Sequence, residues 1–240
     1  MTLQYFPAPH PNKTGILICP GGGYEYISIE NEGTSPAKWL NDRGFDAWIL
    51  SYTCVSAERS ETPISSRCKP IYPAPQTEAL NAINEIRAKY VGTRLTKLGI
   101  WGFSAGGHLA AITATTPGLK LDFAILAYPV ISMDYSITHY GSRTNLLGDD
   151  EEASAELVWA MSAQNRVSAE TPPTFLFHTA NDATVSVKNS LVFAAKLAEF
   201  DHKFKLLVLE DGPHGVGLAE GVKELTWTGE LERWFVGLSL

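Results

Sequence analysis

The stretch KLGIWGFSAGGHLA, residues 97–110, is the most informative part of the sequence for predicting the fold. Its apolar first half predicts a buried strand over Lys97–Phe103, and its Gly- and Ala-rich second half predicts a helix over Gly107–Thr115. Ser104 lies at the turn between them, flanked by Gly102 and Gly106, where a Cβ would collide with neighbouring backbone. This context is typical of a nucleophile elbow, which exposes a reactive serine at the carboxyl edge of a sheet. A G-x-S-x-G string arises by chance in roughly one chain in ten, so the assignment needs partner residues.

Outside this stretch, short apolar runs alternate with longer stretches of helical period. The alternation predicts an α/β fold, in which a mostly parallel central sheet carries helices on both faces. A chain of 240 residues is in the range of one large domain, and we expect a single domain over residues 1–240. The further strands are predicted over Gly15–Cys19, Asp46–Tyr52, Asp122–Ala127, Thr174–Thr179 and Lys203–Leu209.

Helices are predicted between these strands from capping residues and apolar spacing. Ser35 is the expected N-cap of the first helix, with Pro36 at its first helical position and Gly44 closing it. A second helix, Gln76–Tyr90, repeats apolar residues at three- and four-residue steps. Further helices are predicted over Val187–Phe200 and Glu224–Val236. The stretches Ser56–Pro75 and Ser132–Thr171 are the least regular, and we expect them to be insertions at the rim of the sheet, without a large cap domain.

Two later residues supply the partners that Ser104 needs. A serine hydroxyl requires a base to take its proton, and that base requires an acid to hold its tautomer. Asp182 follows the predicted strand Thr174–Thr179, and His214 follows the predicted strand Lys203–Leu209. Alone, each would be interpreted as a turn or loop residue. In the order Ser, Asp, His, with each in a loop after a strand, they match the chain order of α/β-hydrolases and predict a catalytic triad.

The remaining histidines fit the triad less well. His108 lies four residues after Ser104 on the same predicted helix, so we expect it to be packed or to support the site. Asn181 would replace Asp182 poorly, because an amide cannot stabilise an imidazolium by charge. His178 lies within a predicted strand, and the other three, His10, His139 and His202, sit in segments with no strand-end context.

A glycine run follows the first predicted strand, in CPGGGYEY at residues 19–26. Consecutive glycines let backbone N–H groups approach a substrate closely, and we assign those of Gly22, Gly23 and Ala105 to an oxyanion hole. The alternatives are a flexible turn and a phosphate-binding loop, although the G-x-G-x-x-G fingerprint and the P-loop lysine are absent. Tyr24 and Tyr26 are candidates for the apolar wall of the substrate site or for stacking on a sugar ring.

Composition excludes several kinds of partner. A formal net charge of −7 without a basic stripe argues against nucleic acid. No apolar run is long enough to span a bilayer and the N-terminus lacks a secretory pattern, so we expect a cytoplasmic protein, with export left open. Cys19, Cys54 and Cys68 show no metal-ligand spacing and are expected to be reduced and mostly buried, although a Cys54–Cys68 disulfide stays open for an exported protein.

Five segments carry a family resemblance: PGGGY (20–24), GFSAGGHLA (102–110), GSRTNLLG (141–148), TPPTFLFHTANDATVSV (171–187) and GPHGVGL (212–218). Together they resemble the small α/β-hydrolase esterases that include bacterial acetylxylan esterase-like and feruloyl esterase-like proteins. The resemblance implies carboxylesterase activity, often on acetyl groups of plant polysaccharides, without a metal or organic cofactor. Pro20, Ser186 and Pro213 depart from residues common in such relatives, which bears on substrate preference more than on chemistry.

The sequence therefore predicts a serine carboxylesterase that cleaves short-chain acyl esters, with acetyl the expected acyl group, on small molecules or oligosaccharides. Two alternatives use the same residues: an arylformamidase-like amide hydrolase and a small serine peptidase. A third, from another class, is a non-catalytic binding protein on a hydrolase scaffold, which would be expected to have a broken triad. The natural ester and the oligomeric state are left open.

Overall fold

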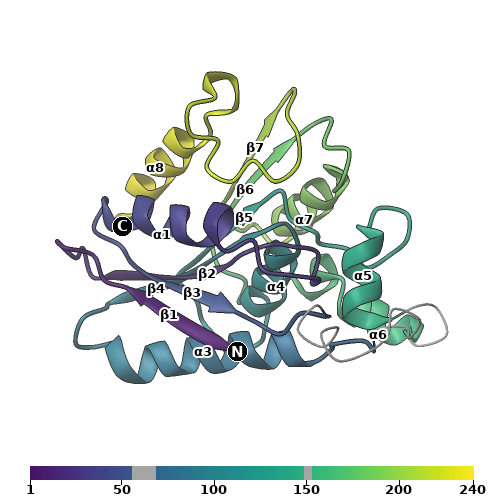
Figure 1. Cartoon of the computed structure of the whole chain (residues 1–240), viewed down its shortest axis with the longest axis horizontal. Coiled ribbons are helices and arrows are strands. Elements are labelled where there is room, and N and C mark those ends of the chain that lie inside the picture. Colours follow the sequence, from purple (N-terminus) through teal and green to yellow (C-terminus); the bar gives the residue numbers. More distant parts are fainter. Residues whose placement is uncertain (56–68, 149–152) are drawn as a thin grey trace.

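The computed structural model describes residues 1–55, 69–148 and 153–240. Its described part contains one seven-stranded sheet in the order β1-β3-β2-β4-β5-β6-β7 (Figure 1). All neighbouring strands are parallel except β1 and β3. The strands are β1 (Thr2–Phe6), β2 (Thr14–Cys19), β3 (Asp46–Ser51), β4 (Lys97–Phe103), β5 (Phe123–Ala127), β6 (Thr174–Thr179) and β7 (Phe204–Leu209).

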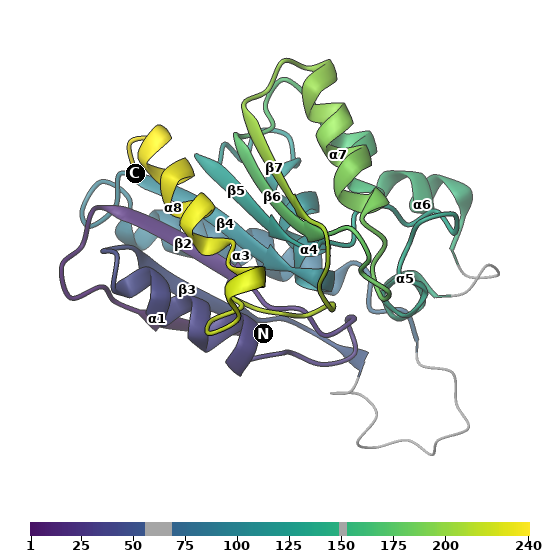
Figure 2. The same cartoon turned by 90° about the horizontal axis from the view of Figure 1, so that it is seen from above.

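Helices cover both faces of the sheet (Figure 2). One face packs against α1 (Ser35–Asn41) and α8 (Thr228–Gly237), and the other against α3 (Ala74–Tyr90), α4 (Ser104–Ala114) and α7 (Lys188–Glu199). Two hydrophobic clusters result, one on each side of the strands. The shorter helical segments are η1 (Glu30–Thr34), α5 (Tyr140–Leu147), α6 (Ala155–Ala160), η2 (Ala163–Arg166) and η3 (Lys223–Leu225).

The predicted strands are confirmed to within one residue at each end. Strands β2, β5 and β6 are buried along their whole length, as their continuous apolar runs require when helices cover both faces. Strand β1 was not predicted. It is the antiparallel edge of the sheet and pairs only with β3 among the described strands, so its mixed burial leaves no continuous apolar run to detect.

One local prediction is wrong, and a second, an insertion at the rim of the sheet, is confirmed in its place but not in its irregularity. Ser35 is not an N-cap, because the π-helix η1 runs directly into α1 and the preceding Thr34 is already helical, with φ −66° and ψ −42°. The stretch Ser132–Thr171 is more regular than expected, since its described part holds α5, α6 and η2 at the carboxyl edge of the sheet (Figure 1). Gly44 does close α1 with a positive φ of 84°. The Cys54–Cys68 pairing concerns a residue outside the described ranges.

Within those ranges, none of the helices combines the length and the apolar character that crossing a bilayer would require.

Candidate active site

The turn at Ser104 has the geometry of a nucleophile elbow. Ser104 begins α4 directly after β4 and has a φ of 52°, a left-handed conformation that L-residues with a side chain rarely adopt. A Cβ on Gly106 would lie 2.0 Å from the Cys19 carbonyl oxygen, and one on Gly102 would lie 2.2 Å from the Gly106 carbonyl oxygen. Only glycine fits at both positions, because α4 packs closely against Gly102 of β4 and its Gly106 packs closely against the end of β2.

Ser104, His214 and Asp182 form one hydrogen-bonded row. Ser104 Oγ lies 2.8 Å from His214 Nε2, and His214 Nδ1 lies 2.7 Å from Asp182 Oδ2. A carboxylate accepts hydrogen bonds, so Nδ1 carries the proton and Nε2 is left to accept the hydroxyl proton of Ser104. The loops after β4, β6 and β7 thus bring together the three residues that the sequence singled out, although they lie up to 110 positions apart.

The carboxylate of Asp182 is held in its charged form. Its Oδ1 accepts the backbone N–H groups of Thr184 and Val185, each at 2.9 Å, and its Oδ2 lies 3.4 Å from His178 Nε2. Burial opposes the charge, but hydrogen bonds from His178, His214 and the Val185 amide outweigh it and hold the pKa of Asp182 well below its usual value. The acid of the row is therefore ionised across the neutral range.

The glycine run after β2 faces the same serine. Gly22 and Gly23 line a cavity of about 460 Å³ together with Ser104 and His214. Gly22 has a φ of 124°, and a Cβ there would lie 2.1 Å from the Tyr26 carbonyl oxygen, so the turn depends on glycine. The N–H of Ala105 lies in the first turn of α4, where N–H groups have no intrahelical partner. This arrangement can offer backbone donors to a negatively charged oxygen bound at Ser104.

Glu32 is a residue at the site that the sequence did not reveal. Its side chain is buried, with Oε2 accepting the Gly21 N–H and Oε1 accepting the Tyr128 hydroxyl, both at 2.8 Å. The Tyr128 oxygen in turn accepts the N–H of Gly217, also at 2.8 Å, and the Tyr128 ring packs edge-on against His214. Burial raises the pKa of Glu32 against these hydrogen bonds. One carboxylate therefore ties the glycine run to the loop that carries His214.

His139 also lines the cavity beside Ser104, although its segment has no strand-end context. Its Nδ1 lies 2.8 Å from Ser142 Oγ and accepts the Ser142 N–H at the start of α5. Burial, together with the nearby His214, lowers the pKa of His139. No sequence signal points to His139, because α5 belongs to a stretch without a regular apolar pattern.

The two tyrosines differ in position. Tyr26 lines the cavity and is largely exposed, as a wall residue should be. Tyr24 is fully buried, and its hydroxyl donates to His108 Nδ1 at 2.7 Å, so it cannot touch a substrate and its prediction as a wall residue is wrong. His108 is packed, as expected, with Nε2 donating to the Met161 carbonyl at 2.7 Å.

Candidate metal ligands do not gather at this site. In the described ranges, no group of three or more His, Cys, Asp or Glu side chains is arranged to hold a metal ion.

Comparison with known proteins identifies the family. The sequence profile of the prolyl oligopeptidase family matches residues 75–238. The chain belongs to this family. It is 30% identical, over 91% of its length, to an acetylxylan esterase of Xylanibacter ruminicola, and covers 44% of that protein. It is 32% identical, over 89% of its length, to endo-1,4-β-xylanase B of Butyrivibrio fibrisolvens, and covers 34% of that protein. The chain thus spans less than half the length of both curated relatives.

Solved structures extend the similarity to the fold. An acetyl ester-xyloside bifunctional hydrolase from Caldicellulosiruptor lactoaceticus superposes with a TM-score of 0.84 and 32% identity, covering 99% of this chain and 88% of that one. A carboxylesterase from Lactobacillus plantarum superposes with a TM-score of 0.76 over 98% of this chain and 92% of that one. Its sequence identity is 23%, so this similarity supports the fold only. The α/β-hydrolase fold and the resemblance to acetylxylan esterases are both confirmed.

Proposed function

We propose that this protein is a serine carboxylesterase that removes short acyl groups, acetyl first among them, from carbohydrate esters. The observation that carries the proposal is the row Ser104–His214–Asp182, with hydrogen bonds of 2.8 and 2.7 Å, at a cavity lined by Gly22 and Gly23. Names of relatives support the substrate class: an acetylxylan esterase and an acetyl ester-xyloside hydrolase are each at least 30% identical to this chain.

The reaction follows from the hydrogen bonds of the row. His214 Nε2 takes the hydroxyl proton as Ser104 Oγ attacks the ester carbonyl carbon, and the resulting oxyanion is bound by the amides of Gly22, Gly23 and Ala105. The C–O bond to the alcohol breaks as His214 returns the proton to the leaving oxygen, which leaves an acyl-serine. Water, deprotonated by the same imidazole, then releases the acid and restores Ser104. Asp182 stabilises the imidazolium in both halves.

The cavity suits a small acyl group attached to a hydroxyl-rich alcohol. Its volume of about 460 Å³ is modest, and its lining is mostly polar: besides Gly22, Gly23 and Gly215 it contains Glu25, Tyr26, Ser28, Asn31, Glu32, Ser104, His139, Thr184 and His214. Long acyl chains would need an apolar groove, which these side chains do not provide.

Replacement of the nucleophile tests the proposal. Ser104→Ala is expected to reduce turnover of p-nitrophenyl acetate by more than about a thousandfold, because the acyl-enzyme cannot form. Circular dichroism and the melting temperature should stay near those of the wild type. Labelling by a fluorophosphonate probe should occur at Ser104 in the wild type and disappear in the variant. Near-normal turnover by Ser104→Ala, or a wild type that never reacts with the probe, contradicts the proposal; the second result would favour a non-catalytic binding protein.

Cleavage of amides is a second candidate, favoured by membership of the prolyl oligopeptidase family. The same row can attack an amide carbonyl, with His214 protonating the leaving amine. A comparison of kcat/KM on acetyl esters, formyl amides and aminoacyl p-nitroanilides separates the possibilities. The esterase proposal expects the acetyl esters to be preferred by at least about a hundredfold.

A further inference from the structure

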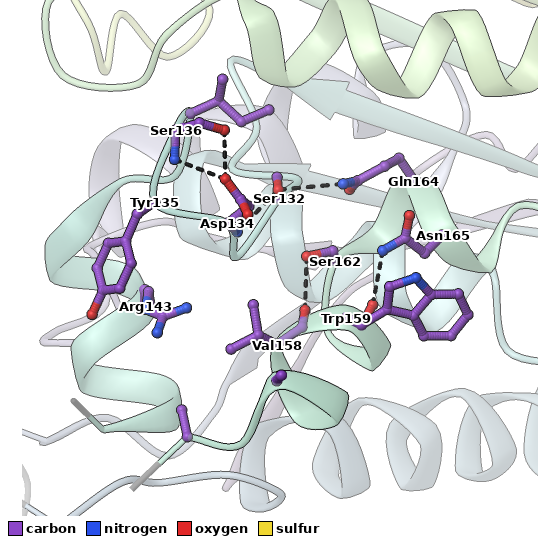
Figure 3. Close-up of a pocket in the computed structure, with 13 residues that line it drawn as sticks. Ser132, Asp134, Tyr135, Ser136, Arg143, Val158, Trp159, Ser162, Gln164 and Asn165 are labelled. Carbon is purple, nitrogen blue, oxygen red and sulfur yellow. Dashed lines mark hydrogen bonds between the residues drawn. The ribbon is translucent and has the colours of Figure 1, made fainter. Parts of the chain in front are cut away.

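A second hollow of about 810 Å³ lies at the carboxyl edge of the sheet, between α5, α6, η2 and the loop that follows β5. Figure 3 shows Tyr135 and Trp159 on opposite sides of it, with Ser132, Asp134 and Gln164 between them. Among the residues that the structure describes, none lines both this hollow and the catalytic cavity. The hydrogen bonds that join Ser104, His214 and Asp182 do not involve it.

Both aromatic rings at this hollow are open to solvent. Trp159 is 61% exposed and Tyr135 is 45% exposed. Burial of a large apolar side chain stabilises a fold, so an exposed tryptophan at a hollow gives up stability that packing would supply. Tyr135 is also held in place: it stacks on Tyr140 with ring centroids 6.0 Å apart, and the Arg143 guanidinium lies 3.8 Å from its ring centroid.

The polar groups of the hollow suit a neutral ligand rich in hydroxyl groups. Gln164 Nε2 donates to Ser132 Oγ at 3.3 Å, whereas Gln164 Oε1 is buried without a hydrogen-bond partner in the described part of the chain. Hydrogen bonds from Ser136 lower the pKa of Asp134, so this side chain is an anion, and the cationic Arg143 that also lines the hollow offsets its charge, which leaves the lining without a net preference for charged ligands. A sugar hydroxyl both donates and accepts, and an aromatic ring offers an apolar face to the ring of a sugar.

The hollow adjoins the catalytic cavity through one loop. Ile137 lines the hollow and His139 lines the cavity, and two residues of trans peptide span at most about 7.6 Å between their Cα atoms. At the other end of this loop, Val130 donates its N–H to the Ser104 carbonyl at 3.0 Å, two residues before Ser132. A short oligosaccharide bound at Ser104 can therefore reach the hollow along the same edge of the sheet.

We propose that this hollow is a subsite for the sugar chain of the ester substrate. A xylo-oligosaccharide that presents its acetyl group to Ser104 lays a neighbouring sugar ring on Trp159 and hydrogen-bonds to Gln164. The inference rests on the proposed carbohydrate esterase function and adds to it the residue that recognises the chain.

Binding without hydrolysis gives the first test. Unacetylated xylohexaose is titrated by calorimetry into Ser104→Ala and into the same variant with Trp159→Ala or Trp159→Phe. We expect Trp159→Ala to weaken binding at least tenfold and Trp159→Phe to retain most of it. Phe200→Ala is the matched control, because Phe200 is 47% exposed but lies just before β7 begins, at the opposite edge of the sheet, and should leave binding unchanged. No binding of xylohexaose, or equal binding by Trp159→Ala, overturns the proposal.

Hydrolysis gives the second test, with Ser104 intact. The ratio of kcat/KM on acetylated xylo-oligosaccharides to kcat/KM on p-nitrophenyl acetate is expected to fall about tenfold in Trp159→Ala, mainly through KM, and to stay constant in Phe200→Ala. A ratio independent of Trp159 overturns the subsite while leaving the esterase intact. Xylohexaose binding that depends on Trp159, in a protein that hydrolyses no acetyl ester, would instead overturn the proposed function.

Discussion

At the scale of single residues, the site depends on contacts between residues that lie far apart in the chain. Ser104 keeps its left-handed φ of 52° because β2 and α4 close around the elbow. Glu32 receives one hydrogen bond from Gly21 and one from Tyr128, which lies 96 positions away. Such a carboxylate fixes the distance between the glycine run and the histidine loop, and the proposed oxyanion binding and proton transfer both depend on this distance.

Substitution of Glu32 is expected to lower kcat more than it raises KM. Glu32→Gln turns one acceptor into an amide donor that faces the Gly21 N–H or the Tyr128 hydroxyl, and Tyr128→Phe removes the acceptor of the Gly217 N–H. We expect each variant to lose about tenfold to a hundredfold in kcat on p-nitrophenyl acetate, since small displacements of reacting groups carry penalties of this size. The double variant should lose less than the product of the two single losses, because both act on one network.

The exposed Glu30, on the same π-helix, gives the control for that experiment. Glu30→Gln should leave kcat, KM and the melting temperature unchanged. A Glu32→Gln variant that melts earlier but keeps full kcat would show that the carboxylate serves stability alone.

At the scale of elements, α4 is tied to its surroundings by one neutral histidine. All residues of α4 are buried, and His108 connects it to Tyr24 after β2 and to Met161 after α6. Because the Met161 carbonyl can only accept, Nε2 carries the proton and Nδ1 accepts from Tyr24. Burial lowers the pKa of His108 to about 4, so the imidazole stays neutral down to acidic pH.

This neutral histidine makes stability depend on pH. The pKa of His108 is about 4 in the folded protein and 6.5 in the unfolded chain. Between these two pH values the unfolded chain binds more protons than the folded protein, so the free energy of unfolding decreases as the pH is lowered. Between pH 7 and pH 5 the loss from His108 should be about 2 kcal/mol. His139, whose pKa burial also lowers, contributes in the same direction, so the measured quantity is the difference between wild type and His108→Gln in urea unfolding at both pH values. An identical loss in the two proteins would contradict the assignment.

At the scale of the whole molecule, an ion pair between the buried Asp46 and the partly exposed Arg94 joins three segments at the amino edge of the sheet. Asp46 begins β3 with a fully buried side chain and accepts Arg94 Nε at 2.5 Å, Arg94 Nη2 at 2.8 Å and the Ala8 N–H at 2.8 Å. Arg94 follows α3, and Ala8 follows β1. The pair thus fixes the edge strand and a crossover to the sheet, on the side opposite Ser104.

Removal of the Arg94 side chain leaves the buried Asp46 carboxylate with fewer hydrogen-bond donors. Arg94→Ala is therefore expected to lower the free energy of unfolding by about 2–3 kcal/mol, measured by urea titration. Lys196→Ala, which breaks the exposed Lys196–Glu199 pair, should change it by no more than about 0.5 kcal/mol. At temperatures where Arg94→Ala is folded, its kcat should match the wild type. Equal effects of the two substitutions would show that the Arg94–Asp46 pair contributes little to stability.

Much of this architecture could be predicted because short stretches of sequence carry the pattern of each strand and of the residues that follow it. The strands of the parallel part of the sheet are continuous apolar runs, and Ser104, Asp182 and His214 each follow one of them. Strand β1 escaped detection because an edge strand keeps polar residues on its open side, and the interpretation of Tyr24 failed because the glycine turn points its ring inward.

Local sequence patterns therefore suffice to predict the fold class, the order of the strands along the chain and the three residues of the candidate triad. The tertiary structure decided which residues support them: Glu32 with Tyr128 behind the glycine run, His139 at the cavity, His178 beside Asp182, and the hollow at Trp159. The difference comes from the distance along the chain over which each kind of interaction acts. Strand and turn propensities act over a few neighbouring residues, whereas these contacts exist only after loops from separate strands meet at one edge of the sheet.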